Sequence, residues 1–173
     1  MGLADVLPFS PQSIASSRTN VIRAAWDRLS HVPGGKILFS KAVGLAAPYT
    51  STIGARVEQL RVGYAEVSLQ DRHAVRNHLS CVHAVALLNL VELTGNLAVA
   101  YSMPDDARFI VAGISIEYLK KARGLLRGTS ECPEIETSER REYLVPVRVW
   151  NKLGEEVARA ELKTLIGPKK ERS

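Results

Sequence analysis

Cysteine is scarce in this chain, and several familiar sequence signatures are missing. The 173 residues include two cysteines, Cys81 and Cys132, whose positions give neither a disulfide framework nor zinc-ligand spacing. The first residues lack the basic and apolar regions of a signal peptide, and Val6 stands where N-myristoylation requires Ser or Thr. The sequence shows no phosphate-binding loop and no dinucleotide-type glycine pattern. We therefore expect a cytoplasmic protein that holds no metal.

Positive charge exceeds negative charge by a small margin. Lys and Arg number 23 against 18 Asp and Glu, which gives a net charge of +5 and an isoelectric point near 9.4. The basic residues are dispersed and form no long stripe, with small clusters at Lys120, Lys121 and Arg123 and at Lys169 and Lys170. This distribution favours a small phosphate-bearing ligand over nucleic acid.

The pattern of apolar residues predicts one medium-sized domain of mixed secondary structure. Helical periodicity predicts two N-terminal helices, the second stopped by Pro48, at residues 12–31 and 36–46. Alternation predicts six strands, near residues 53–57, 65–69, 110–118, 124–132, 143–149 and 158–166. We expect one face of the third strand to carry Ile110, Ala112, Ile114, Ile116 and Tyr118. Short turns between consecutive strands predict an antiparallel sheet.

A long apolar helix is expected between the second and third strands, from about Ser80 as its N-cap to Tyr101. The segment is long enough to span a membrane, but it contains Glu92 at mid-length and has no one-sided flank of Lys and Arg. It is therefore expected to be the buried helix of a soluble protein. The predicted fold is an α+β hotdog fold, in which an antiparallel sheet wraps around one long buried helix.

The polar residues of this region resemble those of a known superfamily. Asn77, His83 six residues later and Glu92 nine residues after that resemble the Asn…His-Gly-Gly…Asp/Glu signature of hotdog-fold acyl-CoA thioesterases, in the 4-hydroxybenzoyl-CoA and phenylacetyl-CoA thioesterase-like group. Residues 116–124 and 147–160 are similar to later segments of that group. The His-Ala pair and the helical lead are most similar to an uncharacterised thioesterase-like branch with an N-terminal helical extension. We accordingly expect three parts, at residues 1–48 (helical extension), 49–168 (hotdog domain) and 169–173 (basic tail).

The resemblance implies hydrolysis of an acyl-thioester, carried by coenzyme A or by an acyl carrier protein, with no cofactor beyond the coenzyme A of the substrate. The backbone N–H of Ala84 would polarise the thioester carbonyl, and Asn77 would hold the thioester or position the nucleophile. Glu92 would be the nucleophile or general base, and His83 an orienting hydrogen-bond partner.

Other polar residues have two interpretations. Lys120, Lys121 and Arg123 could contact the phosphates of coenzyme A or form a solvated strand end. Asn89 and Asn96 could bind substrate or only satisfy the polar face on which Glu92 lies. Asn77, in the same way, could do no more than brace the loop before the helix.

Helix geometry adds a prediction about assembly. Nine residues at about 100° each place His83 and Glu92 roughly 180° apart around the helix axis and about 13 Å apart along it. One helix cannot present both side chains to one thioester, so we expect a homodimer in which a second copy supplies Glu92. Dimers could pair further into tetramers. The alternative functions are a non-catalytic acyl-thioester or lipid-binding protein, such as a sensor or carrier, and an oligomeric scaffold.

Overall fold

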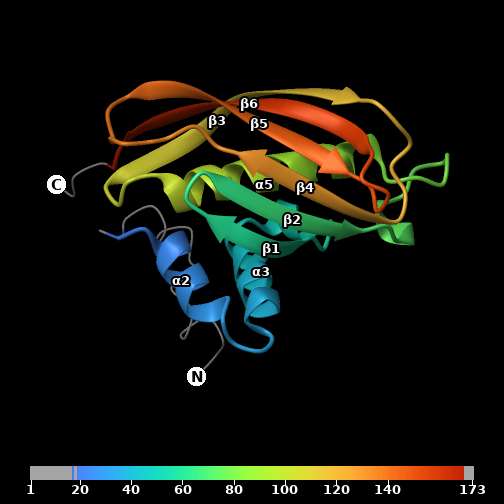
Figure 1. The fold of residues 1–173 in the computed structure, drawn as a ribbon, viewed down its shortest axis with the longest axis horizontal. Coiled ribbons are helices and arrows are strands. Elements are labelled where there is room, and N and C mark those ends of the chain that lie inside the picture. Colours follow the sequence, from blue (N-terminus) through green and yellow to red (C-terminus); the bar gives the residue numbers. More distant parts are fainter. Residues whose placement is uncertain (1–16, 18, 170–173) are drawn as a thin grey trace.

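Six strands form a single antiparallel sheet that curves around a long central helix (Figure 1). The structure is a computed structural model, which describes residue 17 and residues 19–169. The sheet order is β1-β2-β4-β5-β6-β3, and the strands are β1 (Arg56–Arg61), β2 (Tyr64–Gln70), β3 (Ala107–Tyr118), β4 (Leu125–Glu131), β5 (Arg141–Trp150) and β6 (Glu156–Pro168). The central helix is α5 (Ala84–Ser102). The predicted α+β hotdog fold is confirmed.

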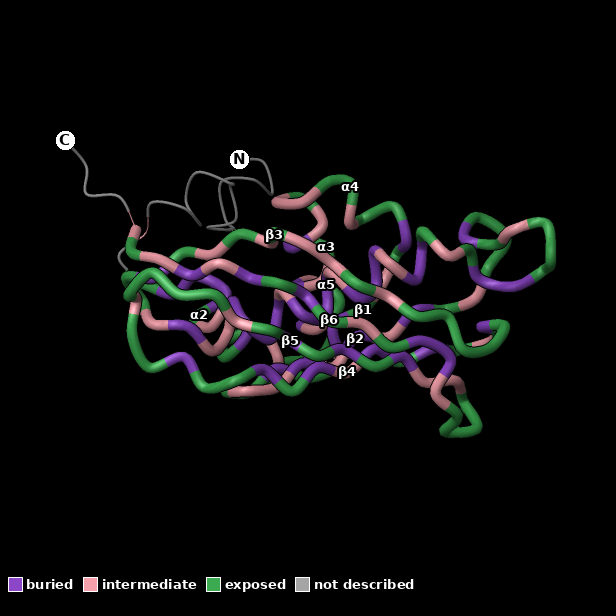
Figure 2. The backbone as a smooth tube through the Cα atoms, turned by 90° about the horizontal axis from the view of Figure 1, so that it is seen from above, coloured by how far each residue is buried: buried purple, intermediate pink, exposed green. Residues whose placement is uncertain are grey.

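Close contact between α5 and the sheet depends on two glycines. A Cβ placed on Gly95 of α5 would lie 2.6 Å from a methyl carbon of Leu162, and one on Gly128 of β4 would lie 2.7 Å from Thr94 Oγ1. Leu162 and Thr94 are both fully buried. Buried residues run through the middle of the molecule, where α5 meets the sheet, while the loops at its ends are exposed (Figure 2). The position of α5 is therefore set by tight packing on the concave face of the sheet.

Helices from the N-terminal part of the chain pack beside α5 and β1. They are α2 (Val21–Leu29), α3 (Gly35–Ala46) and α4 (Pro48–Ser51), and a short 3-10 helix, η2 (His73–Val75), precedes α5. The helix predicted for residues 12–31 corresponds to α2, which begins at Val21 because Asn20 caps it; residues 12–16 and 18 lie outside the described part. The second predicted helix, α3, ends at Ala46, and Pro48 then begins the short helix α4. Proline is tolerated at the first position of a helix, because the N–H that it lacks would have no partner there.

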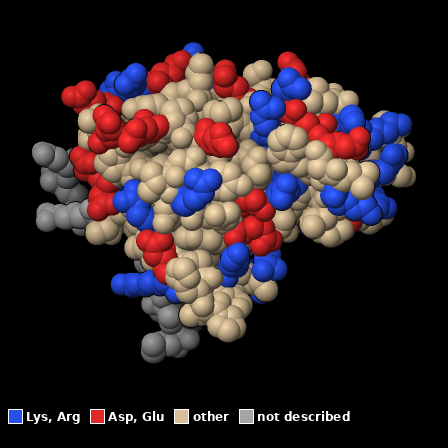
Figure 3. Space-filling view, viewed as in Figure 1, with Lys and Arg blue, Asp and Glu red and all other residues tan. Residues whose placement is uncertain are grey.

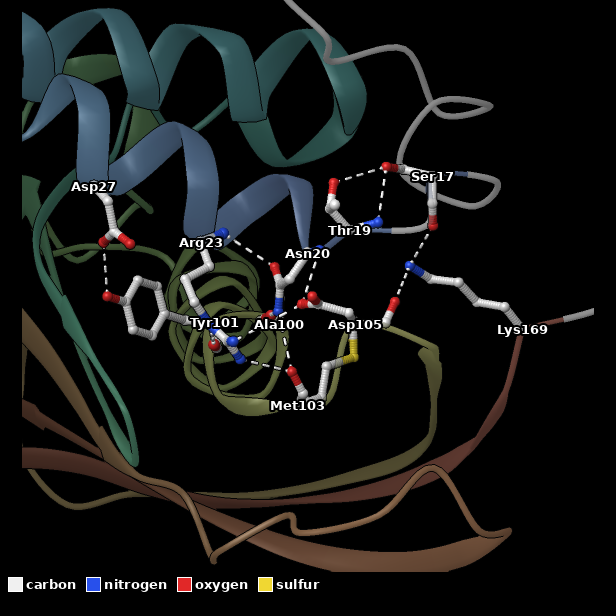
Figure 4. A network of polar contacts seen from close by, with 10 residues as sticks. All are labelled: Ser17, Thr19, Asn20, Arg23, Asp27, Ala100, Tyr101, Met103, Asp105 and Lys169. Carbon is white, nitrogen blue, oxygen red and sulfur yellow. Dashed lines mark hydrogen bonds and ion pairs between the residues drawn. The ribbon is translucent and has the colours of Figure 1, made fainter.

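A polar network joins α2 to the C-terminal end of α5 (Figure 4). Asn20 accepts a hydrogen bond from the Arg23 N–H at 3.0 Å and donates through Nδ2 to the Ala100 carbonyl at 2.7 Å. Arg23 donates to the carbonyls of Tyr101 and Met103, at 2.8 and 2.7 Å. These carbonyls have no partner within α5, since the last turn of a helix leaves its C=O groups free. The start of α2 thus completes the end of α5.

The two edges of the sheet differ. At β1, Ser40 of α3 accepts a hydrogen bond from the Val57 N–H, and Lys36 of α3 donates to the Glu58 carbonyl. At the other end of the sheet, β3 pairs with β6 on one side, and no described strand pairs with its other side. Ile110 on this strand is 66% exposed. The open edge of the described sheet is therefore β3.

Two local predictions are wrong, each for a backbone reason. A β-bulge between Val111 and Gly113 shifts the register of β3 against β6. It separates the predicted face, so that Ile110 and Ala112 are exposed while Ile114 and Ile116 pack against the core. Ser80 is not an N-cap: it adopts a positive φ of 53° in a turn, and α5 begins four residues later.

The length and composition of α5 raise the question of whether this helix spans a membrane. α5 has 19 residues and is long and apolar enough to cross a bilayer, but 67% of its most apolar window is buried within the fold. That burial is typical of the core helix of a soluble protein.

On the face seen in Figure 3, basic and acidic side chains are interspersed.

Candidate functional site

The start of α5 presents an unpaired backbone N–H group. His83 is the N-cap, and its Nδ1 accepts a hydrogen bond from the Val85 N–H at 3.1 Å. The His83 carbonyl accepts from the Leu87 N–H at 3.0 Å. Among the described residues, none accepts a hydrogen bond from the Ala84 N–H. Since the first turn of a helix carries partial positive charge, this N–H is suited to bind an oxygen that gains negative charge. His83 itself orients the helix start.

Asn77 contributes a second free donor. Its Oδ1 accepts hydrogen bonds from the Leu79 N–H at 2.9 Å, from the Cys81 N–H at 3.4 Å and from the Cys81 thiol at 3.4 Å. Two backbone donors on one atom identify that atom as the oxygen and so define the orientation of the carboxamide. No described residue accepts from Nδ2. Asn77 therefore braces the loop, as one interpretation predicted, and also keeps an amide donor available.

One pocket at the start of α5 brings four of the predicted site residues together. It has a volume of about 330 Å³, and we call it the Ala84 pocket. Asn77 and Ala84 line it from the loop and the helix, while Lys120 and Lys121 line it from the segment after β3; the other lining residues are Cys81, Val82, Leu87, Tyr118, Leu119 and Ala122. Lys120 also pairs with Glu155 at 2.7 Å, which lowers the pKa of that carboxyl. The pocket combines two neutral donors with two cations, so it suits an anionic ligand that carries a carbonyl group.

Arg123, unlike Lys120 and Lys121, does not line the Ala84 pocket. Its guanidinium donates to the carbonyls of Ser80 and Leu79, at 3.2 and 3.3 Å, and so holds the loop that precedes α5. The nearby Asp71 supports the same loop, because it accepts from Arg76 at 2.6 Å and from the Gly124 N–H at 3.1 Å. The Arg76 hydrogen bond holds the pKa of Asp71 below its usual value. The Ala84 pocket thus has a braced rim.

The remaining predicted residues lie elsewhere on α5. Glu92 is half-buried, lines neither pocket at the helix start and has no hydrogen bond or ion pair with a described residue. Asn96, one turn further on, keeps a buried Oδ1 without a partner. Asn89 and His83 line a second pocket of about 220 Å³ on another side of the helix. Within one chain, the structure does not bring Glu92 to Asn77 and Ala84.

Two residues of the Ala84 pocket for which the sequence predicted no role at the site, Cys81 and Tyr118, form side-chain hydrogen bonds there. Cys81 donates through its thiol to Asn77, and the Tyr118 hydroxyl donates to the Ala84 carbonyl at 3.1 Å, with a pKa raised by burial. Tyr118 belongs to the segment 116–124, whose family resemblance was the available signal. The other cysteine, Cys132, is buried, and burial raises the pKa of its thiol to about 12. Both cysteines are buried, as expected of small apolar residues.

Comparison with sequence families identifies the group to which the chain is related. Residues 35–166 match the family described as "Domain of unknown function (DUF4442)". The chain belongs to the DUF4442 family. DUF4442 is a thioesterase-like family, and the match begins at the start of α3, so it includes that helix with the sheet and α5. The search of curated proteins found no match.

Solved structures similar to this chain share its fold. A crystallised structural-genomics target is 32% identical, with a TM-score of 0.75, and the alignment covers 85% of this chain and 98% of that one. A protein of unknown function from Pseudomonas aeruginosa, named a probable thioesterase, is 21% identical over 79% of this chain and 97% of its own, with a TM-score of 0.69. A thioesterase family protein from Silicibacter pomeroyi is 17% identical, covers 74% and 95%, and has a TM-score of 0.64. The last two similarities show the shared fold.

Proposed function

We propose that this DUF4442 protein hydrolyses acyl-thioesters, with acyl-CoA as the substrate, at sites shared between two copies of the chain. The observation that carries the proposal is the pair of free donors in the Ala84 pocket, the Asn77 Nδ2 group and the Ala84 N–H. Two donors at a helix N-terminus can hold the thioester oxygen and stabilise the negative charge that develops on it when the carbonyl carbon is attacked.

Glu92 is the carboxylate that completes the reaction. As a general base it takes a proton from water while the water oxygen bonds to the carbonyl carbon. The carbon–sulfur bond then breaks and the protonated Glu92 returns the proton to the leaving sulfur, which releases a carboxylic acid and a thiol. As a nucleophile it attacks the carbonyl carbon itself, the carbon–sulfur bond breaks to release the thiolate, and water then hydrolyses the resulting anhydride. Either role requires an unpaired carboxylate, and Glu92 has no partner among the described residues of its own chain.

The edge strand β3 supports a homodimer. It is 12 residues long, its outer backbone edge has no partner among the described strands, and Ile110 on it is largely exposed. Such an edge is a template for pairing with another strand, and pairing with β3 of a second copy would satisfy it by two-fold symmetry. Because Glu92 cannot face the Ala84 pocket of its own helix, the second copy has to supply it.

The choice of coenzyme A rests on the lysines. Lys120 and Lys121 stand at the Ala84 pocket, and Lys121 has no ion-pair partner among the described residues. Lysine ammonium groups bind phosphates as point charges, and coenzyme A carries several phosphates at the end of its pantetheine arm. A cationic rim beside a thioester-binding pocket fits such a carrier.

The first experiment measures thiol release from a panel of acyl-CoA and acyl-carrier thioesters. Glu92→Gln removes the carboxylate with little change in shape, and Asn77→Ala removes the amide donor; each is expected to lower kcat by about 10²-fold or more. Glu161→Gln is the matched control, since Glu161 is an exposed β6 residue. Full activity in Glu92→Gln would defeat the mechanism. Binding of acyl-CoA without hydrolysis of any member would instead support the non-catalytic binder.

The second experiment tests whether the site is shared. A heterodimer of one Glu92→Gln chain and one Asn77→Ala chain, purified by two different tags, contains one intact site if each site uses residues of both chains. It should then recover about half of the wild-type activity, although each parent homodimer is nearly inactive. If Asn77 and Glu92 act within one chain, the heterodimer stays as inactive as its parents.

A further inference from the structure

A third pocket lies beside the N-terminal helices, apart from the Ala84 pocket. It has a volume of about 580 Å³ and is bounded by α3, α4, the start of β1 and Leu93 of α5; we call it the α3 pocket. Small-molecule sites typically have volumes of about 300–1,000 Å³. None of the residues that line the α3 pocket lines the Ala84 pocket. A ligand of this pocket therefore need not be a thioester.

The apolar wall of the α3 pocket extends from the core to the surface. Val43 and Leu93 are largely buried and form its inner part. Ile37 and Leu45 lie at the mouth, and they are 46% and 62% exposed. They are eight residues apart on α3, which is about 12 Å along one face of the helix. Exposed aliphatic side chains around a cavity are typical of a site that binds an apolar group.

Three hydroxyl side chains also line the α3 pocket, and two of them already donate to backbone carbonyls. Ser40 donates to the Lys36 carbonyl at 2.7 Å, and Ser51 donates to the Pro48 carbonyl at 2.6 Å. Thr50 is the third. The wall thus offers few polar groups that a ligand would have to satisfy.

The charged residues at the α3 pocket are both cations. Lys41 lies on α3 midway between Ile37 and Leu45, is exposed and has no ion pair with a described residue. Arg56 is the second cation, and its Nε lies 3.5 Å from the Glu58 carboxylate. No carboxylate is among the described residues that line the pocket. The Lys41 ammonium group is therefore available to an anion at the mouth of an apolar cavity.

We propose that the α3 pocket binds a free fatty acid, with the aliphatic chain in the pocket and the carboxylate at Lys41. The chain leaves water for an apolar wall, while the carboxylate and the ammonium pair at the surface, where neither charge is buried. A neutral lipid lacks the ion pair, and a short carboxylate leaves the apolar wall in contact with water. The inference does not depend on the proposed hydrolase activity.

The first test titrates the whole protein with ligands by calorimetry, below the concentrations at which they form micelles. Across hexanoate, octanoate and decanoate, we expect the affinity to rise by about threefold or more for each added methylene group. Decanoate should also bind more tightly than 1-decanol or decyltrimethylammonium, which have a similar chain with no charge or a positive charge. Equal affinities along the series, tighter binding of the cation, or no binding of decanoate would overturn the inference.

Variants then locate the site. Leu45→Gln should weaken decanoate binding by about threefold or more, and Leu153→Gln, which changes a 75% exposed leucine in the loop between β5 and β6, is its control. Lys41→Gln should weaken decanoate binding by about threefold and leave 1-decanol binding unchanged. Lys152→Gln, at an exposed lysine of that same loop, is the matched control. Decanoate binding that neither Leu45→Gln nor Lys41→Gln alters would contradict the assignment.

Competition separates the α3 pocket from the proposed substrate site. The affinity for decanoate should be the same with and without saturating S-decyl-CoA, a non-hydrolysable thioether. Displacement of decanoate by S-decyl-CoA, but not by coenzyme A, would mean that the α3 pocket holds the acyl chain of the thioester, and would overturn a separate fatty-acid site. Thiol release from acyl-CoA without decanoate binding would reject this site and leave the hydrolase in place. Decanoate binding without thiol release would do the reverse.

Discussion

At the scale of single residues, the site depends on polar groups with one end satisfied and the other free. Asn77 saturates its oxygen with loop donors and keeps its NH₂ group available. His83 caps α5 through Nδ1, and the cap leaves the neighbouring Ala84 N–H unpaired. Alanine at position 84, where the resembled signature has glycine, keeps the backbone N–H, so the donor that the proposed function uses does not require glycine.

Ala84 allows the N–H donor to be deleted with little disturbance of the fold. Ala84 is the first residue of α5, where proline is tolerated, and His83 has φ −64° and ψ 142°, a conformation compatible with a following proline. We expect Ala84→Pro to remain folded and to lose about 10²- to 10³-fold in kcat, as for the loss of one oxyanion donor. Ala84→Gly keeps the N–H and is the control. Stopped assays for thiol release check both, and an active proline variant would exclude the N–H from catalysis.

Asp71 makes stability depend on pH. Its pKa is lowered in the folded protein, chiefly by the Arg76 hydrogen bond, so its contribution is present above the unfolded-state pKa of about 4 and is lost as pH falls through the folded-state pKa. Asp71→Asn should lower the free energy of unfolding by about 1–3 kcal/mol at pH 7. The difference from wild type should shrink steadily below about pH 4. Urea unfolding at several pH values measures it, and a difference that does not vary with pH would refute the assignment.

At the scale of elements, α5 and the sheet are fitted to one another by small residues. Gly128 of β4 lies directly against Thr94, whose hydroxyl donates to the Leu90 carbonyl at 2.7 Å. This contact helps to fix the position of α5 on the sheet. The N-terminus of α5 then lies next to the loop of Asn77 and the segment after β3. Strand and helix contacts thus set the geometry of the Ala84 pocket.

Gly128→Ala tests this fit. The added methyl group would lie 2.7 Å from Thr94 Oγ1, so the buried helix or side chain has to shift. We expect the free energy of unfolding to fall by about 1–3 kcal/mol. Gly167→Ala on β6 is the matched control, since nothing lies within 4 Å of its added Cβ, and it should change stability by no more than about 0.5 kcal/mol. Denaturant unfolding compares the two, and equal effects would show that the contact is not tight.

Sequence patterns predicted some features of these elements correctly and others wrongly. The strand predicted near residues 143–149 lies within β5, and its alternating Val145, Val147 and Val149 are buried. The inward face of β3 was predicted wrongly, because a bulge inserts one residue and alternation cannot reveal where. Ser80 looked like an N-cap, but the cap is decided by which backbone groups are free, and His83 holds that position.

At the scale of the whole molecule, the sheet formed by the described residues has one covered edge and one open edge. α3 covers β1, so the N-terminal helices leave β3 as the strand available to a second copy. A dimer through β3 would continue the sheet across both chains.

Ile110→Lys is expected to weaken this dimer. An isoleucine that is 66% exposed on an edge strand is consistent with burial by a partner, and lysine on an edge strand opposes pairing. The dissociation constant from sedimentation equilibrium should rise by about tenfold or more. Leu153→Lys is the control, because Leu153 is 75% exposed but lies in the loop between β5 and β6. Equal effects of both substitutions would place the interface elsewhere.

The sequence by itself determined the elements whose period is long and regular: the buried helix with its polar residues, the antiparallel strands and the hotdog fold. These follow from burial, which acts on neighbours along the chain. Only the tertiary structure decided which polar groups meet. It set Ala84 beside Lys120, paired Arg123 with loop carbonyls and left the Asn89 Oδ1 without a donor among the described residues. The reason is physical: such contacts join residues far apart in sequence, and they depend on strand register and close packing of α5, which no local pattern records.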